Sequence, residues 1–250
     1  MKVLISLSSF GAAETGRHGQ LWCTDLAQQA GADGVEVRGE LLRDAATELP
    51  ALAGRAAVYS SPEGLWTLQG ELDEAALARG VQAAQVLRAP RLKMSIGGFF
   101  PSSHASLQRL KALLQAAPQV ELVIENDQTA TAGTLAAMQA FFAAQAQAGL
   151  DLGMTFDMGN WHWQGECPLQ AAQALAPYVR YVQCSACPPS GWRCRWPIRW
   201  RHGAPCCALC LPMCRMPLNT RWWVTTWWPS RASRWPLSAL HGRLHDRPGF

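Results

Sequence analysis

The last 67 residues of this 250-residue chain contain no lysine and no glutamate. Residues 184–250 carry 10 arginines and a single acid, Asp246, whereas residues 1–183 carry 12 Lys and Arg against 17 Asp and Glu. The same 67 residues hold 8 of the 12 tryptophans and 7 of the 9 cysteines. Ordinary domains use both signs of charge and all four charged residue types. The chain therefore divides into two parts, 1–183 and 184–250.

Long apolar runs are also missing. No run reaches the roughly 20 residues that span a bilayer, and the N-terminal run Val3–Leu7 is too short for a secretory signal. We therefore expect a cytoplasmic protein without a membrane partner. In a reducing compartment its cysteines would be thiols or metal ligands rather than disulfides.

Residues 1–183 alternate between short apolar runs and segments with helical spacing, such as those around Leu107 and Leu135. The apolar runs are Val3–Leu7, Gly34–Val37, Ala56–Tyr59, Leu92–Ile96, Val120–Ile124, Leu152–Phe156 and Val179–Val182. Such alternation predicts parallel strands joined by helices. We predict an α/β fold of the (β/α)8 TIM-barrel type, with seven β/α units in 1–183 and an irregular tail in place of the eighth.

Two motifs place carboxylates where strands should end. Glu125 ends the run in "ELVIENDQT", and Asp157 ends the run in "LGMTFDMGNWHWQGE". The ends of TIM-barrel strands carry the active site, and carboxylates from adjacent strands bind divalent cations. We predict Glu125 and Asp157 as metal ligands and Glu125 as the catalytic group that moves a proton next to a sugar carbonyl. The alternative is that both carboxylates cap the helices that follow.

Further polar or aromatic residues follow or lie within the predicted strands. We predict that a sugar substrate is contacted by Glu36, Arg38, Lys93, Asn160 and Trp161. Glu36 and Arg38 are as well explained by an ion pair at the edge of the core. Lys93 is expected to point into the barrel, and Trp161 either stacks on a sugar or packs in the core.

Residues 1–183 resemble the xylose-isomerase-like TIM barrels of the sugar phosphate isomerase/epimerase family, and within it the bacterial 2-ketogluconate-utilisation epimerases. The resemblance rests chiefly on "IENDQT" and "GMTFDMGNWHWQGE", supported by "SLSSFGA", "YSSPEGLW" and "LKMSIG". It implies an isomerase that binds a divalent metal ion (Mn, Mg, Co or Zn) and a small sugar, sugar phosphate or sugar acid, and that binds no nucleic acid. Assembly into a homo-oligomer stays open.

The resemblance also implies four metal ligands: a Glu, an Asp, a His and a second Glu. Glu125 and Asp157 match the first two. Gln183, in "YVRYVQCS", stands where the His belongs, and the tail contains no glutamate to supply the fourth.

The stretch "RWWVTTWWPSR" (221–231) suggests why these ligands are missing. Tryptophan has a single codon, so the neighbouring reading frame is largely determined. Read from the third base of each codon, the region from Leu218 onward allows "EYPLVGDDLVAV", an apolar strand that carries a glutamate and is followed by a turn and the start of a helix. We interpret residues 184–250 as an out-of-frame translation.

Other readings remain open. The pairs Cys184/Cys187 and Cys207/Cys210 have the spacing of a zinc module, and interleaved Arg and Trp would suit nucleic acid. For the whole chain, the alternatives to an epimerase are a zinc-dependent endonuclease acting at abasic sites and an inactive, frameshifted product.

The nucleotide sequence across codons 175–190 tests the frameshift. We expect it to show an insertion or deletion where the two frames join. An intact frame, with no strand-like text readable in the neighbouring one, would contradict the interpretation.

Overall fold

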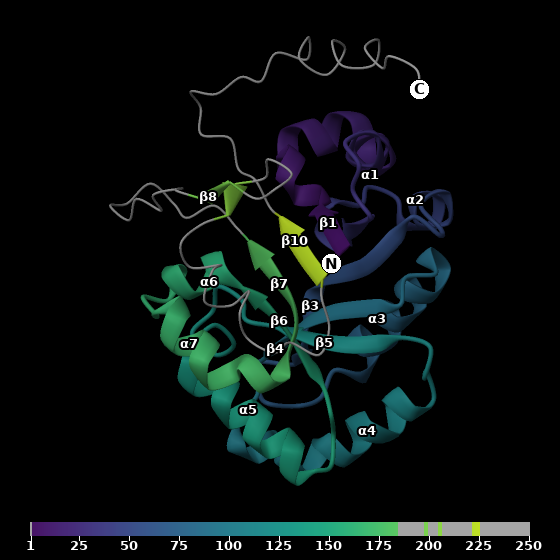
Figure 1. The fold of residues 1–250 in the computed structure, drawn as a ribbon. Helices are drawn as coiled ribbons and strands as arrows, with labels where there is room; N and C mark the ends of the chain where they lie inside the picture. Colours follow the sequence, from purple (N-terminus) through teal and green to yellow (C-terminus); the bar gives the residue numbers. More distant parts are fainter. Residues whose placement is uncertain (1, 185–197, 200–204, 207–221, 226–250) are drawn as a thin grey trace.

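The computed structural model describes residues 2–184 and three short strands, at 198–199, 205–206 and 222–225. Seven strands follow the predicted apolar runs and point the same way around a barrel, with helices on the outside (Figure 1). These strands are β1 (Lys2–Ser6), β2 (Gly34–Arg38), β3 (Ala56–Trp66), β4 (Arg91–Gly97), β5 (Glu121–Glu125), β6 (Gly153–Asp157) and β7 (Val179–Cys184). The predicted α/β TIM-barrel class is confirmed.

Helices lie between consecutive strands of this series and cover the outer face of the barrel (Figure 1). They are α1 (Ala12–Gln29), α2 (Ala45–Ala51), α3 (Glu74–Leu87), α4 (Leu107–Gln115), α5 (Leu135–Gln147), α6 (Met158–Trp163) and α7 (Pro168–Leu175). Four 3-10 turns accompany them: η1 (Leu7–Phe10), η2 (Gly39–Leu41), η3 (Pro101–Ser106) and η4 (Ala176–Tyr178). Within the described ranges, no helix has the length and apolar character that crossing a membrane requires.

Side chains start several helices by binding the free amides of the first turn. Asp73 accepts from the Ala76 amide at 2.8 Å at the start of α3, and Thr134 accepts from Ala137 at 3.3 Å at the start of α5. Such caps satisfy backbone donors that have no partner within the helix. They fix where each helix leaves the strand end before it.

Strands β3 and β4 approach closely at their C-terminal ends, and this requires glycine. Gly97 has φ +61°, and a Cβ there would lie 2.4 Å from the Trp66 carbonyl oxygen. A larger residue would separate the two strands or strain the backbone. Beyond this point the chain of β3 turns back, so that Trp66 forms an antiparallel bridge with Leu72.

The barrel also has an eighth strand, although residues 184–250 were expected to form only an irregular tail. Strand β10 (Trp222–Thr225) pairs in parallel with both β1 and β7 and closes the ring (Figure 1). Along these residues β1 and β7 are therefore not free edges, in contrast to the expected open barrel. Strands β8 (Ile198–Arg199) and β9 (Pro205–Cys206) form a separate antiparallel pair. The rest of the predicted irregular tail after β10, residues 226–250, lies outside the described residues.

Apolar side chains form two separate clusters. The larger cluster lies between the strands and the surrounding helices and includes Leu92, Ile124, Phe141 and Phe156. The smaller consists of Leu4, Val58, Val123 and Tyr181, from β1, β3, β5 and β7. Because alternate strands of a TIM barrel contribute each interior layer, this small cluster is an apolar layer inside the barrel. The polar interior residues lie above it, toward the C-terminal ends of the strands.

The pairing of β10 can be tested through the backbone. Val224→Pro removes one N–H from the strand that lies between β1 and β7. We expect faster amide hydrogen exchange at Leu4 and Val182, measured by NMR or mass spectrometry, while the β4 amides stay protected. Unchanged protection of β1 and β7 would show that Trp222–Thr225 does not close the barrel.

Candidate active site inside the barrel

Lys93 lies at the centre of the polar interior. Its side chain is fully buried, and its Nζ donates to Glu36 Oε1 at 3.1 Å, Glu125 Oε1 at 2.7 Å and Gln183 Oε1 at 2.9 Å. These partners come from β2, β5 and β7, while Lys93 is on β4. The prediction that Lys93 points into the barrel is confirmed. Alternation along each strand places all four side chains on its inner face.

Glu36 uses both carboxylate oxygens inside the barrel. Oε1 accepts from Ser6 Oγ at 2.9 Å and Arg38 Nη1 at 3.1 Å, in addition to Lys93, and Oε2 accepts from the Tyr181 hydroxyl at 2.8 Å. Glu36 is fully buried. Glu36 and Arg38 thus form the ion pair that was the alternative to substrate contact. Direct contact of either residue with a substrate remains a prediction.

The two interior carboxyl groups differ in acidity. Burial alone would raise the pKa of Glu36, but the charges of Lys93 and Arg38 and the hydrogen bonds from Tyr181 and Lys93 outweigh it and hold this pKa at about 2. Burial raises the pKa of Glu125 to about 7, against the opposing charges of Lys93 and Arg38 and with help from Asp157 and Glu36. Glu36 is therefore a permanent anion, whereas Glu125 changes protonation near neutral pH.

Asp157 and Asn126 tie the ends of β5 and β6 together. The Asn126 side chain donates to the Asp157 carbonyl oxygen and accepts from the Asp157 amide, both at 2.9 Å. Asn160 Nδ2 in turn donates to the Asn126 carbonyl oxygen at 2.7 Å, and Gln128 Nε2 donates to Asn160 Oδ1 at 3.3 Å. The two sequence motifs thus form one hydrogen-bonded unit. Asn160 thus holds the backbone at Asn126, and its contact with a substrate remains a prediction.

The carboxylate of Asp157 caps α6. Its Oδ1 accepts from the Gly159 amide at 2.7 Å and from the Asn160 amide at 3.2 Å. The capping alternative is therefore observed for Asp157. Glu125 instead binds Lys93, although the charge of Asp157 contributes to its raised pKa, as expected for carboxyl groups on neighbouring strands.

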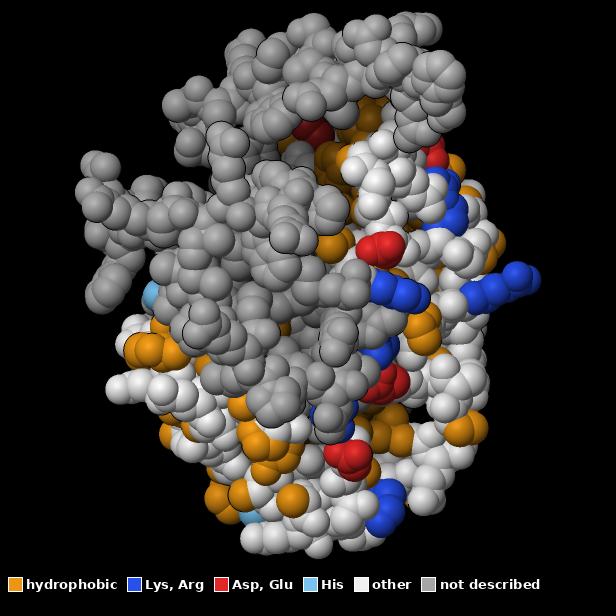
Figure 2. Space-filling view, in the orientation of Figure 1, with side chains coloured by type: hydrophobic (Ala, Val, Ile, Leu, Met, Phe, Trp, Pro, Cys, Tyr) orange, Lys and Arg blue, Asp and Glu red, His pale blue; other side chains and the backbone are white. Residues whose placement is uncertain are grey.

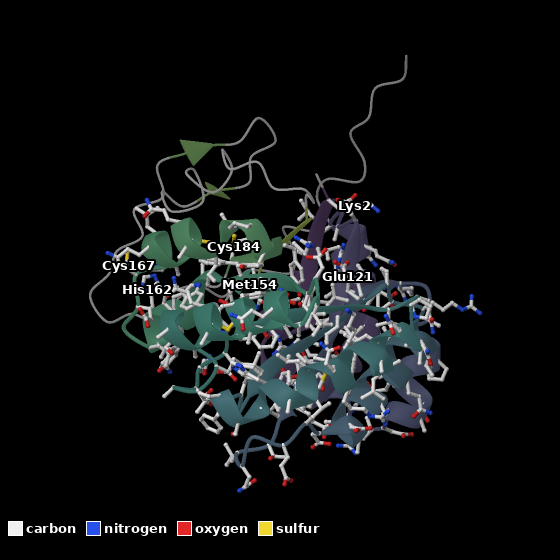
Figure 3. All side chains as sticks on the ribbon, turned by 90° about the horizontal axis from the view of Figure 1, so that it is seen from below. Lys2, Glu121, Met154, His162, Cys167 and Cys184 are labelled. Carbon is white, nitrogen blue, oxygen red and sulfur yellow. The ribbon has the colours of Figure 1, made fainter. Side chains whose placement is uncertain are left out.

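Trp161 and His162 follow on α6, where Trp161 packs in the core and His162 is half-buried. Trp161 is fully buried, and its ring centroid lies 5.5 Å from that of Phe156. These are core contacts, and stacking of Trp161 on a sugar remains a prediction. Burial lowers the pKa of His162, and Figure 3 shows His162 and Cys167 together at the edge of the molecule near α6 and α7.

The described residues do not fit a divalent metal well. Glu125 and Asp157 provide two of the four expected ligands, but Glu125 is bonded to an ammonium and Asp157 to backbone amides. Gln183 presents an amide oxygen that also accepts from Lys93. Within the described part of the chain, no group of three or more His, Cys, Asp or Glu side chains is arranged to hold a metal ion. The cysteine pairs that suggest a zinc module have three of their four members outside the described residues.

Sequence analysis missed two residues that shape this site. Tyr181 lies two positions before Gln183, so both side chains are on the same face of β7. This spacing could have identified Tyr181 as an interior residue. Gln20 on α1 holds the end of β2 by donating to the Arg38 carbonyl oxygen at 2.8 Å and accepting from the Arg38 amide at 2.9 Å. No pattern in α1 distinguishes Gln20 from its neighbours.

Solved structures share this fold. An L-ribulose 3-epimerase matches with a TM-score of 0.62 and 18% identity over 100% of this chain and 89% of its own. The 3-keto-D-glucoside 4-epimerase from E. coli matches with a TM-score of 0.59 and 15% identity over 96% of both chains. An AP endonuclease of family 2 from Brucella melitensis matches with a TM-score of 0.60 and 15% identity, over 92% of this chain and 93% of its own.

At these identities the likeness establishes the fold. The chain matches no protein-family model, and no curated protein matches it in sequence.

The hydrogen bond from Tyr181 to Glu36 yields a test with a matched control. Tyr181→Phe should lower the free energy of unfolding at pH 7 by about 2 kcal/mol, because it removes a hydrogen bond to a buried charge. Tyr178→Phe, where the ring stacks on Phe142 with centroids 4.3 Å apart, should change it little.

The pH dependence has a definite sign. A carboxyl group whose pKa falls on folding stabilises the protein above its unfolded pKa, and this stabilisation is lost as pH falls through the folded pKa. The difference between wild type and Tyr181→Phe, measured by urea unfolding, should therefore shrink from about pH 5 toward the Glu36 value of about 2. A difference independent of pH would contradict the assignment.

Proposed function

We propose that this barrel is built to epimerise or isomerise a sugar, sugar phosphate or sugar acid by moving a proton on the carbon next to a carbonyl group. The observation that carries the proposal is Glu125, a largely buried carboxyl group at the C-terminal end of β5, hydrogen-bonded to Lys93 at 2.7 Å. A general base works best when its pKa lies near the working pH, and that of Glu125 is about 7.

In this proposal the residues have separate roles. Glu125 removes the proton and returns it, while the positive charges of Lys93 and Arg38 offset negative charge that develops on the substrate oxygen. Glu36, held ionised, keeps the Lys93 ammonium in place through their hydrogen bond. The solved epimerases that share the fold support this reading by analogy only.

We expect the reaction to depend on a metal ion only when all four ligands implied by the resemblance are present. These include a His at position 183 and a second glutamate, which this chain lacks. The neighbouring frame would supply that glutamate from codons 218 and 219, which precede β10 (Trp222–Thr225) in the sequence. The repaired eighth strand must therefore begin earlier in the chain than β10 to place this glutamate at its C-terminal end.

An endonuclease acting at abasic sites is less well supported. Residues 1–183 carry 12 Lys and Arg against 17 Asp and Glu, which opposes binding to a phosphate backbone. On the face shown in Figure 2, the charged side chains of the described residues are scattered and of both signs rather than gathered into a basic stripe. The three described histidines lie on α1, η3 and α6, and none on a strand facing the interior.

Solvent deuterium exchange tests the proposal. The repaired chain, with His at 183 and the neighbouring frame restored, should exchange the proton next to the carbonyl of a keto-sugar or sugar acid in D2O, followed by proton NMR with added Mn²⁺. The chain as it stands should be close to background, because two expected ligands are missing. Glu125→Gln in the repaired chain should lower the exchange rate by about 100-fold or more.

Two results would contradict the proposal in different ways. A folded, metal-binding repaired chain that exchanges nothing across a panel of keto-sugars and sugar acids would refute the epimerase assignment. Full-rate exchange by the chain as it stands would refute the frameshift interpretation, because Gln183 and the tail would then be functional.

A further inference from the structure

The ammonium of Lys93 is completely satisfied by protein oxygens. An ammonium group has three N–H donors, and Lys93 has three acceptors at 2.7 to 3.1 Å, on Glu36, Glu125 and Gln183. All three distances are within the normal hydrogen-bond range. The side chain is fully buried, so this is a closed cation site whose cation belongs to the chain itself.

Two of these three acceptors occupy positions at which the resemblance implies metal ligands. Glu125 is the first expected ligand, and position 183 is the third, where an imidazole is replaced by an amide. A neutral amide oxygen accepts well from an ammonium, whereas imidazole nitrogen is the better ligand for zinc, copper or iron ions. The change from His to Gln therefore favours the ammonium over metal ions that prefer nitrogen ligands, such as zinc.

Electrostatics point the same way. Lys93 lies against Glu36 on β2, Glu125 on β5 and Gln183 on β7. Arg38 and Tyr181 contact Glu36, and the charge of Asp157 on β6 acts on Glu125. A divalent ion at Glu125 would lie close to the positive charge of Lys93, and like charges in a poorly solvated interior repel strongly. Displacing Lys93 would also weaken a buried ion pair, which is strongly destabilising.

We propose that Lys93 is the resident cation of this barrel and occupies the place of a divalent metal at Glu125. In the chain as it stands, with Gln183 and without a second glutamate ligand, Glu125 engages a divalent ion only when Lys93 is removed. The inference is independent of the sugar substrate and of proton transfer, and metal binding tests it separately from exchange activity.

The full-length chain, stripped of metal, is titrated with Mn²⁺, and free Mn²⁺ is followed by electron paramagnetic resonance. We expect no saturable binding by the wild-type chain below about 1 mM, since Glu125 is already neutralised. Lys93→Met should bind Mn²⁺ at least about tenfold more tightly. Saturating Mn²⁺ should raise the Tm of this variant by about 5 °C and leave that of the wild type unchanged.

Lys111→Met is the matched control, because Lys111 lies on α4 outside the barrel. It should behave as the wild type. Micromolar Mn²⁺ binding by the wild-type chain that is lost in Glu125→Gln would overturn the proposal without any need for the Lys93 variant to fold.

A second pair of variants separates ligand loss from competition by Lys93. Gln183→His alone supplies an imidazole but keeps the ammonium, so Mn²⁺ binding should stay weak. Adding Lys93→Met to it should produce the tightest binding of the series. If Gln183→His alone binds Mn²⁺ as tightly as the double variant, Lys93 does not compete with the metal and the proposal is wrong.

Discussion

The buried ion pair between Lys93 and Glu36 is the interaction on which the barrel interior depends. Neither group reaches water, so each needs the other and the hydrogen bonds around them to remain charged. Those bonds involve Ser6, Glu125 and Gln183 as well as Arg38 and Tyr181. They link five strands of the ring, and a shift of any of these strands would leave a buried charge without a partner.

The same network gives the two carboxyl groups different properties. Glu36 takes most of the available positive charge and both hydroxyl donors, and it remains an anion at all ordinary pH values. Glu125 shares one bond with Lys93 and is otherwise governed by its burial. Two carboxyl groups in one barrel are thereby suited to different roles, Glu36 to a structural one and Glu125 to proton transfer.

Local sequence patterns were sufficient to predict the strand positions and the inward direction of Lys93. Apolar runs marked all seven strands of residues 2–184, because buried parallel strands are apolar on both faces at their centres. The runs did not predict the extension of β3 to Trp66, which depends on the close approach of Gly97. Nor could they predict β10, since "WWVT" has no strand-like alternation and its pairing partners, β1 and β7, are distant in the sequence.

The candidate site was predictable only in part, because its contacts join distant parts of the chain. Glu125 and Asp157 were recognisable at strand ends, but the partners of Lys93 lie 32 to 90 residues away in the sequence. The hydrogen bond between Tyr181 and Glu36 spans 145 residues. Whether Asp157 binds a metal or caps α6 depends on the geometry of the following turn, which the residue type alone does not determine.

A crystal structure of the full chain grown with Mn²⁺ tests this account most directly. The account predicts Lys93 Nζ within hydrogen-bond distance of Glu36, Glu125 and Gln183, with no metal ion bound to Glu125. A manganese ion bound by both Glu125 and Asp157, with Lys93 turned away from them, would contradict it.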